Sequence, residues 1–154
     1  MWSDRELRQM LEANPDLRLA DDVATEVPVS TSSIPAISEH QLQSLIIAEC
    51  DRRSILRVEY GLIFAIPNGG HRHPAVAAKL KAEGVRAGVP DLMLPVARQG
   101  YHGLFVELKC GPNKPSEAQQ DWLRNLRSEG YLCHVVWDSV DEAMGLIEEY
   151  LEGK

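Results

Sequence analysis

Apolar residues recur at helical spacing after Ser38 and predict the first helix of the compact part of the chain. Ser38 and Gln41 have the spacing of a capping box, which predicts a helix over about residues 39–57. Glu39 and Glu49 border the apolar face of that helix. The residues expected on the apolar face are Leu42, Leu45, Ile46 and Leu56.

The rest of the chain alternates between short apolar runs and segments with helix caps. The apolar runs predict strands over 62–66, 91–96, 104–109 and 132–137, with a hairpin turn at 98–100 between the second and third. Caps and stop signals predict further helices over about 3–13, 74–83, 117–129 and 140–151. The order α-α-β-α-β-β-α-β-α predicts an α/β or α+β domain with a mixed sheet. A crossover helix is expected between its third and fourth strands.

Residues 15–36 differ in composition from the rest of the chain. They contain three prolines, many small polar residues and no stable hydrophobic period. We therefore divide the chain into an N-terminal helix and flexible arm, residues 1–36, and a compact domain, residues 37–154.

The overall composition is typical of one globular domain. The chain has 154 residues, of which 44% are hydrophobic and 25% charged. No apolar run approaches the ~20 residues needed to span a bilayer, and the N-terminus lacks the apolar region of a secretory signal. Three widely spaced cysteines form no CxxC pair, which favours reduced thiols and a cytoplasmic location.

The charge is distributed unevenly along the chain. The formal net charge is −7, and a total of this sign argues against a nucleic-acid partner. However, residues 1–36 hold 3 basic and 7 acidic residues, and residues 115–154 hold 3 basic and 9 acidic ones. Residues 37–114 hold 10 basic and 7 acidic residues. The middle of the chain is therefore basic and compatible with binding phosphates.

Three charged residues on two neighbouring strands are the strongest chemical signal. Glu107 and Lys109 are two positions apart on one strand and point to the same face, where unpaired charge is costly. Asp91 opens the preceding strand, and a hairpin would place it near the other two. Two adjacent carboxylates repel each other unless a cation lies between them. Mg²⁺ uses one or two carboxylates and leaves room for a phosphate, so the pattern predicts phosphodiester hydrolysis.

These residues lie in two of five segments that resemble the PD-(D/E)XK nuclease superfamily. Within it, the chain resembles the VRR-NUC (virus-type replication-repair nuclease) domain. The five segments are 38–43, 66–70, 88–92, 104–109 and 116–123. The resemblance implies a restriction-endonuclease-like αβββαβ core with a mixed central sheet flanked by helices. It makes residues 37–154 the nuclease domain, with the helix near 74–84 inserted between the first two strands.

The resemblance also implies a metal site for Mg²⁺ or Mn²⁺. Asp91 and Glu107 would be the main ligands, and the backbone carbonyl of Leu108 a further one. Glu39 would complete the site, directly or through water. A carboxylate at that position can instead simply stabilise a helix N-terminus, and Glu49 is a rival for the role.

Two further residues are assigned catalytic roles by the resemblance. Lys109 would assist catalysis, either by holding the attacking water or by neutralising charge on the phosphoryl group. Gln119 would orient Lys109 or a water. The alternative for Gln119 is that it only closes a capping box with Ser116.

Several residues in the basic middle segment are candidates for contacts with the DNA backbone. These residues are Asn68, His71, Arg72, His73, Lys79, Arg86 and Lys114. The alternative is that they are ordinary solvated surface residues. His71 and His73 also have the spacing of a zinc pair, but no CxxC or third histidine is nearby. Trp122 and Trp137 are expected in the core.

The expected function is a metal-dependent, structure-selective DNA endonuclease. Stand-alone members of this family resemble phage or bacterial proteins that act as homodimers on branched DNA, so a Holliday-junction (four-way junction) resolvase with a role in DNA repair is the leading hypothesis. Two symmetric cuts require two sites related by a twofold axis, which a homodimer supplies. The alternatives are a flap endonuclease or nickase, a sequence-specific restriction enzyme, and a non-catalytic DNA-binding module. No membrane partner is expected.

Overall fold

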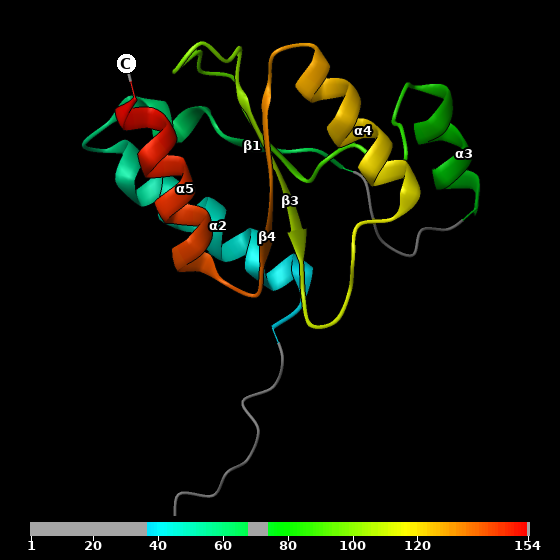
Figure 1. The fold of residues 1–154 in the computed structure, drawn as a ribbon. Coiled ribbons are helices and arrows are strands. Elements are labelled where there is room, and N and C mark those ends of the chain that lie inside the picture. The colour runs from blue at the N-terminus through cyan, green and yellow to red at the C-terminus, as the bar shows by residue number, and fades with distance from the viewer. Residues whose placement is uncertain (1–36, 68–73, 154) are drawn as a thin grey trace, which may run out of the picture. The chain divides into compact units, whose positions relative to one another are not determined.

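A computed structural model describes residues 37–67 and 74–153 (Figure 1). The predicted helix over 3–13 and the arm up to residue 36 lie outside the described residues. The elements in chain order are α2 Glu39–Ser54, a 3₁₀ helix η2 Val58–Leu62, β1 Phe64–Ala65, α3 Pro74–Ala82, β2 Leu92–Leu94, β3 Leu104–Lys109, α4 Glu117–Ser128, β4 Leu132–Trp137 and α5 Val140–Glu152. None of these helices is long and apolar enough to cross a membrane.

The four strands form one mixed sheet in the order β1-β2-β3-β4. β1 pairs antiparallel with β2, and β2 pairs antiparallel with β3. β3 and β4 are parallel, with Leu104 opposite Leu132 and Lys109 opposite Trp137, and α4 is the crossover between them. The predicted mixed sheet with its crossover helix is therefore confirmed.

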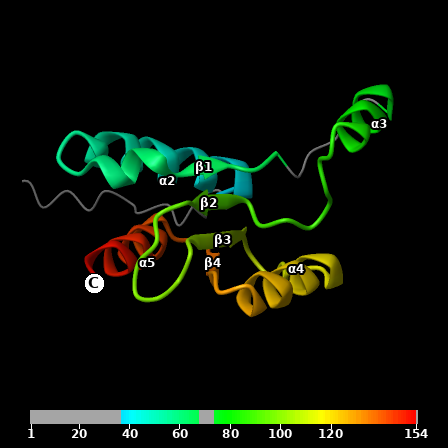
Figure 2. The same cartoon turned by 90° about the horizontal axis from the view of Figure 1, so that it is seen from above.

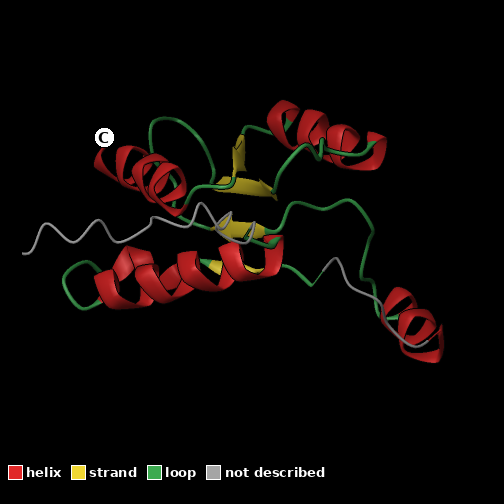
Figure 3. Cartoon of the chain, turned by 90° about the horizontal axis from the view of Figure 1, so that it is seen from below, coloured by secondary structure: helices red, strands yellow, loops and turns green. Residues whose placement is uncertain are grey.

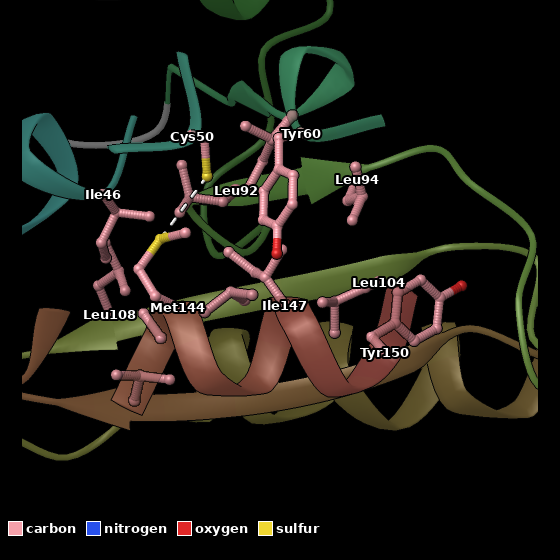
Figure 4. Close-up of a cluster of buried hydrophobic side chains, with 14 of the residues drawn as sticks. Ile46, Cys50, Tyr60, Leu92, Leu94, Leu104, Leu108, Met144, Ile147 and Tyr150 are labelled. Atoms are coloured by element: carbon pink, nitrogen blue, oxygen red, sulfur yellow. Dashed lines mark hydrogen bonds between the residues drawn. The ribbon is translucent and has the colours of Figure 1, made fainter. Parts of the chain in front are cut away.

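Helices cover both faces of the sheet (Figures 2 and 3). On one face, α2 and α5 bury an apolar core against alternate residues of β3, namely Leu104, Val106 and Leu108. Figure 4 shows Ile147 and Tyr150 of α5 within this core. On the other face, α4 packs Leu123 near Phe105 and Cys133. The alternation of β3 thus directs Phe105, Glu107 and Lys109 to the α4 face.

Side-chain caps define the starts of the three helices that pack on the sheet. The Oγ atoms of Ser38 and Ser116 accept hydrogen bonds from the N–H groups of Gln41 and Gln119, and both glutamines complete capping boxes. Ser139 caps α5 in the same way by accepting from the N–H of Glu142. These local signals are why the three starts agree with the prediction.

The predicted apolar face of the first helix is wrong in two positions. The buried residues of α2 are Leu42, Ile46 and Cys50, which follow one another at a spacing of four. Leu45 lies about 100° around the helix from Ile46 and is half-exposed at 51%. Leu56 is 92% exposed, because α2 ends at Ser54 and the helical phase no longer applies to it.

Two strands are shorter than predicted. Of the run expected to be a strand over 62–66, only Phe64–Ala65 form β1, because Leu62 is the last residue of the 3₁₀ helix η2. β2 ends at Leu94, because Pro95 has no N–H group to donate to a ladder. The turn of the hairpin follows the prediction, since Gln99 and Gly100 both have positive φ and Arg98 bridges to Tyr101.

Gly88→Ala is expected to destabilise the fold more than Gly100→Ala. Both glycines have left-handed φ, +84° and +82°, which costs a side-chain-bearing residue about 1–2 kcal/mol. A Cβ at Gly88 would also lie 2.9 Å from the carbonyl carbon of Ala118 on α4, whereas nothing lies within 4 Å at Gly100. We expect Gly100→Ala to lower the free energy of unfolding by about 1–2 kcal/mol and Gly88→Ala to lower it by about twice as much. Urea unfolding measures both changes. Equal losses would contradict the close packing of Gly88 on α4.

Candidate active site

The candidate site lies at the end of the sheet where β3 finishes and β2 begins. Because Leu92 pairs with Val106 in an antiparallel ladder, the preceding residue, Asp91, comes next to Glu107. The N-terminus of α2 lies beside the arrowhead of β3 (Figure 1). The N-terminus of α4 reaches the same place from the opposite face. Side chains from β3, from the residue before β2 and from two helices therefore meet there.

Asp91 is held by the backbone of β3. Its Oδ2 accepts a hydrogen bond of 2.8 Å from the N–H of Leu108, while its own carbonyl accepts one of 2.7 Å from the N–H of Ile66. Burial raises the pKa of the Asp91 carboxyl, and the Leu108 hydrogen bond opposes part of that rise. The carboxylate is thus fixed in position through one oxygen.

Glu107 is fully buried and lies at the centre of the site. Its Oε1 is 2.7 Å from the Nζ of Lys109 and also accepts a hydrogen bond from the Nε2 of Gln119. Burial raises the pKa of Glu107 to about 7, with Lys109 lowering it and Asp91 and Glu39 raising it further. A carboxylate that is buried next to other carboxylates needs a nearby positive charge to stay ionised.

Lys109 supplies part of that charge. Its Nζ donates to the carbonyl of Leu108 at 2.8 Å and lies 3.4 Å from Oε1 of Glu39, in addition to its pairing with Glu107. Burial lowers the pKa of Lys109, but the hydrogen bond and charge of Glu107 outweigh this, so the pKa lies above its usual value. The ammonium is therefore kept charged and aimed at the group of carboxylates.

Glu39 lies nearer to this group than its rival Glu49. Glu39 occupies the first turn of α2, with its side chain 42% exposed and within reach of Lys109. Glu49 instead accepts hydrogen bonds from Arg52 and Arg53, which lower its pKa to about 2. The structure thus brings Glu39 to the candidate site and commits Glu49 to a surface ion pair.

Gln119 closes the predicted capping box, and the side chain predicted to orient Lys109 or a water contacts Glu107. Its Oε1 accepts a hydrogen bond of 2.8 Å from the N–H of Ser116 and so closes the capping box. Its Nε2 donates to Glu107. Since one amide group makes both contacts, the cap of α4 also holds the buried carboxylate in place.

The donor set can accommodate a divalent metal ion. Glu107 Oε2 is buried and has no hydrogen-bond partner within the part of the chain that the structure describes. A buried carboxylate oxygen without a donor is costly, and a cation would satisfy it. Over residues 37–67 and 74–153, no three Asp, Glu, His or Cys side chains form a ready-made ligand group. A site built on two carboxylates and a carbonyl nevertheless suits Mg²⁺, which keeps several waters.

Of the candidate DNA contacts, three fall in the described residues. Lys79, Arg86 and Lys114 are exposed, and Lys79 lies 3.7 Å from Glu83 in an ion pair. The remaining candidates, Asn68, His71, Arg72 and His73, lie outside the described residues, as does the possible zinc pair.

The two tryptophans are not core residues as predicted. Trp137 is 42% exposed, because it is the last residue of edge strand β4. Trp122 is half-buried beside a cavity, and its Nε1 donates to the carbonyl of Ala87. The signal that could have found Trp122 is its spacing of three from Gln119, which puts both on one side of α4.

Two comparisons relate this arrangement to known proteins. The chain matches the VRR-NUC domain family over residues 37–137. It is also similar to a solved structure of a VRR_NUC domain protein, with 31% sequence identity and a TM-score of 0.61. That match covers 76% of this chain and 90% of the other. No curated protein matches the chain.

Proposed function

Because the chain belongs to the VRR-NUC domain family, nucleases of the PD-(D/E)XK type, we propose that it is a Mg²⁺- or Mn²⁺-dependent endonuclease acting on branched DNA. The observation that carries the proposal is the group of Asp91, Glu107 and Lys109 at one end of the sheet, where a buried oxygen of Glu107 has no hydrogen-bond partner among the described residues. A purely structural role would leave that oxygen with a donor.

Asp91, Glu107 and the carbonyl of Leu108 would hold the metal ion, with Glu39 completing the site directly or through water. A bound divalent ion supplies Lewis acidity, which activates water and neutralises charge on the phosphate. The hydrogen bond from Leu108 to Asp91 ties two of these groups together, so that they are positioned before substrate arrives.

Lys109 and Gln119 have different roles in the proposed reaction. The Lys109 ammonium stabilises the negative charge that grows on the phosphoryl oxygens, or holds the attacking water. Gln119 acts as a positioning residue, since its amide ties Glu107 to the start of α4. Attack of water breaks the P–O bond and yields a terminal phosphate and a free hydroxyl.

We propose that the protein acts as a homodimer and that its substrate is a four-way DNA junction. Large apolar side chains are exposed around the end of α2: Ile55 is 83%, Leu56 92% and Val58 72% exposed. Leu62 and Phe64 continue this series, which we call the 55–64 patch. Several exposed large apolar side chains within one short segment are typical of protein interfaces, and a twofold interface would give the two sites needed for paired cuts.

Leu56→Glu is expected to dissociate this homodimer. A charged side chain in an apolar interface is left without a partner, so the affinity between copies falls. Light scattering should give twice the 17.2 kDa chain mass for the unmodified protein at micromolar concentration and a single mass for the variant. Val76→Glu, at an exposed apolar residue on α3, is the matched control and should stay dimeric. A single chain mass for the unmodified protein would contradict the dimer.

The proposed activity is tested with labelled four-way junctions, flaps, nicked duplexes and single strands, each with and without Mg²⁺ or Mn²⁺. We expect metal-dependent cuts placed symmetrically about the junction centre, with the Lys109→Ala protein as inactive control. Preferred cutting of flaps or single nicks would favour the alternative within the family. Sequence-dependent cutting would favour a restriction enzyme. Binding without cleavage on every substrate would leave only a DNA-binding module.

A further inference from the structure

A cavity of about 420 Å³ lies beside the candidate active site. Its walls include Ile66, Val85, Val89 and Trp122, with Arg86 and Glu83 at its polar side, and we call it the Trp122 pocket. Its volume falls in the range of small-molecule sites, and its lining is mainly apolar with few polar groups.

The Trp122 pocket shares its walls with the backbone that carries the candidate catalytic residues. The N–H of Ile66 donates to the carbonyl of Asp91 at 2.7 Å, and Val89 is two residues before Asp91. Trp122 follows Gln119 by three positions on α4. A substrate phosphate at the site would therefore have its neighbouring nucleotides beside this pocket.

The indole of Trp122 is held in place rather than free to rotate. Its Nε1 donates to the carbonyl of Ala87 at 3.1 Å, and Gly88 packs directly on Ala118 of the same helix. A second cavity, of about 220 Å³, is lined by Ala118, Asp121, Asn125 and again Trp122. Trp122 thus lines two cavities, and open space beside an aromatic side chain is a condition for stacking a planar group on it.

The charges around the pocket suit a nucleotide. Arg86 is exposed at its rim, and the guanidinium makes one long hydrogen bond of 3.4 Å to the carbonyl of Lys81. Glu83 is the acidic residue of the lining and lies 3.7 Å from Lys79. An apolar pocket with an aromatic wall and an arginine at the rim matches a base with its phosphate.

We propose that the Trp122 pocket receives one unpaired nucleobase of the substrate, stacked on the indole, with Arg86 at the adjoining phosphate. The inference rests on the proposed nuclease function and adds to it a means of recognising branched DNA. A fully paired duplex keeps its bases stacked, whereas a branch point or bulge releases one at low cost. The pocket would therefore select distorted DNA without reading its sequence.

The test compares binding to a fully paired four-way junction and to junctions carrying one unpaired thymine at successive positions around the crossover. The full-length Lys109→Ala protein keeps the substrate intact, and fluorescence anisotropy gives each affinity. We expect junctions with the thymine at one or more positions to bind about tenfold tighter than the fully paired junction. This affinity ratio corresponds to the free energy of base–aromatic stacking. Adding Trp122→Ala should bring the ratio close to one, while Trp122→Phe should keep most of it.

Trp137→Ala is the matched control for Trp122→Ala, because Trp137 is exposed but lines neither of the two cavities. Its ratio should equal that of the parent protein. Photocrosslinking from 5-iodouracil at the preferred position should attach to Trp122, which keeps the proposal testable if Trp122→Ala fails to fold. A ratio near one at every position, or an unchanged ratio in Trp122→Ala, would overturn the pocket assignment while cleavage persists. Failure of the unmodified protein to bind or cut any DNA would instead overturn the proposed nuclease activity.

Discussion

Glu107→Gln is expected to reduce metal-dependent DNA cleavage by at least about 10²–10³-fold, the loss typical of removing one preorganised electrostatic group. The substitution preserves the size of the side chain. The amide oxygen can still accept the hydrogen bond from Gln119, so the contact that fixes the side chain remains available. What is lost is the negative charge and the second carboxylate oxygen, which has no hydrogen-bond partner over residues 37–67 and 74–153. Single-turnover cleavage of a labelled junction measures the effect.

The matched control for this variant is Glu117→Gln. Glu117 is an exposed glutamate in the first turn of α4, two residues before Gln119, and it has no part in the proposed site. The same chemical change there should leave the cleavage rate within about twofold, since isolated surface charges contribute little. Metal binding followed by calorimetry should also weaken in Glu107→Gln. Full cleavage by that variant would remove Glu107 from the catalytic group.

Lys109→Met is expected to destabilise the metal-free fold by about 3–5 kcal/mol, the usual cost of removing one partner of a buried ion pair. Glu107 is fully buried and Lys109 only 5% exposed, so water cannot replace the missing partner. Replacing both residues, as Glu107→Leu with Lys109→Met, should recover most of the loss, because buried pairs are often no better than apolar side chains of similar volume. Urea unfolding of the four proteins in EDTA completes a double-mutant cycle.

The pH dependence gives an independent readout of the same pair. The folded-state pKa of Glu107 is raised from 4.5 to about 7, so its contribution to stability is present below about pH 4.5 and is lost as the pH rises through 7. Removing the Lys109 ammonium removes a group that lowers this pKa. The unfolding free energy of Lys109→Met should therefore fall more steeply than that of the unmodified protein between about pH 5 and 8. Additive losses in the cycle with parallel pH profiles would contradict coupling between the two residues.

The arrangement of the candidate site was largely predictable because it depends on short-range rules. A spacing of two on a strand puts Glu107 and Lys109 on one face, and antiparallel pairing puts Asp91 beside them. Each rule requires only the strand period and the turn at Gln99 and Gly100. The helix caps at Ser38 and Ser116 were predictable for the same reason, since donor and acceptor are three residues apart.

The errors fall where distant parts of the chain decide the outcome. Helical periodicity predicts Leu56 on the buried face, but the end of α2 at Ser54 leaves it exposed. The sequence predicts Trp137 in the core, whereas its position on an edge strand depends on the order of the whole sheet. The choice between Glu39 and Glu49 also required the fold. Both border the same helical face, and only the packing of α2 against β3 brings Glu39 to Lys109.

Read without a structure, the order of the amino acids predicts the mixed sheet, the helices that flank it and the acidic and basic residues at the end of β3. These follow from periodicity and capping, which act over a few residues. Three features emerge only from the folded arrangement. Glu107 is fully buried, and one of its oxygens has no hydrogen-bond partner in the part of the chain that the structure describes. Gln119 serves the cap and the carboxylate together, and a cavity opens beside Trp122. Burial and hydrogen-bond satisfaction depend on which segments distant in the chain pack together, and no local pattern encodes that.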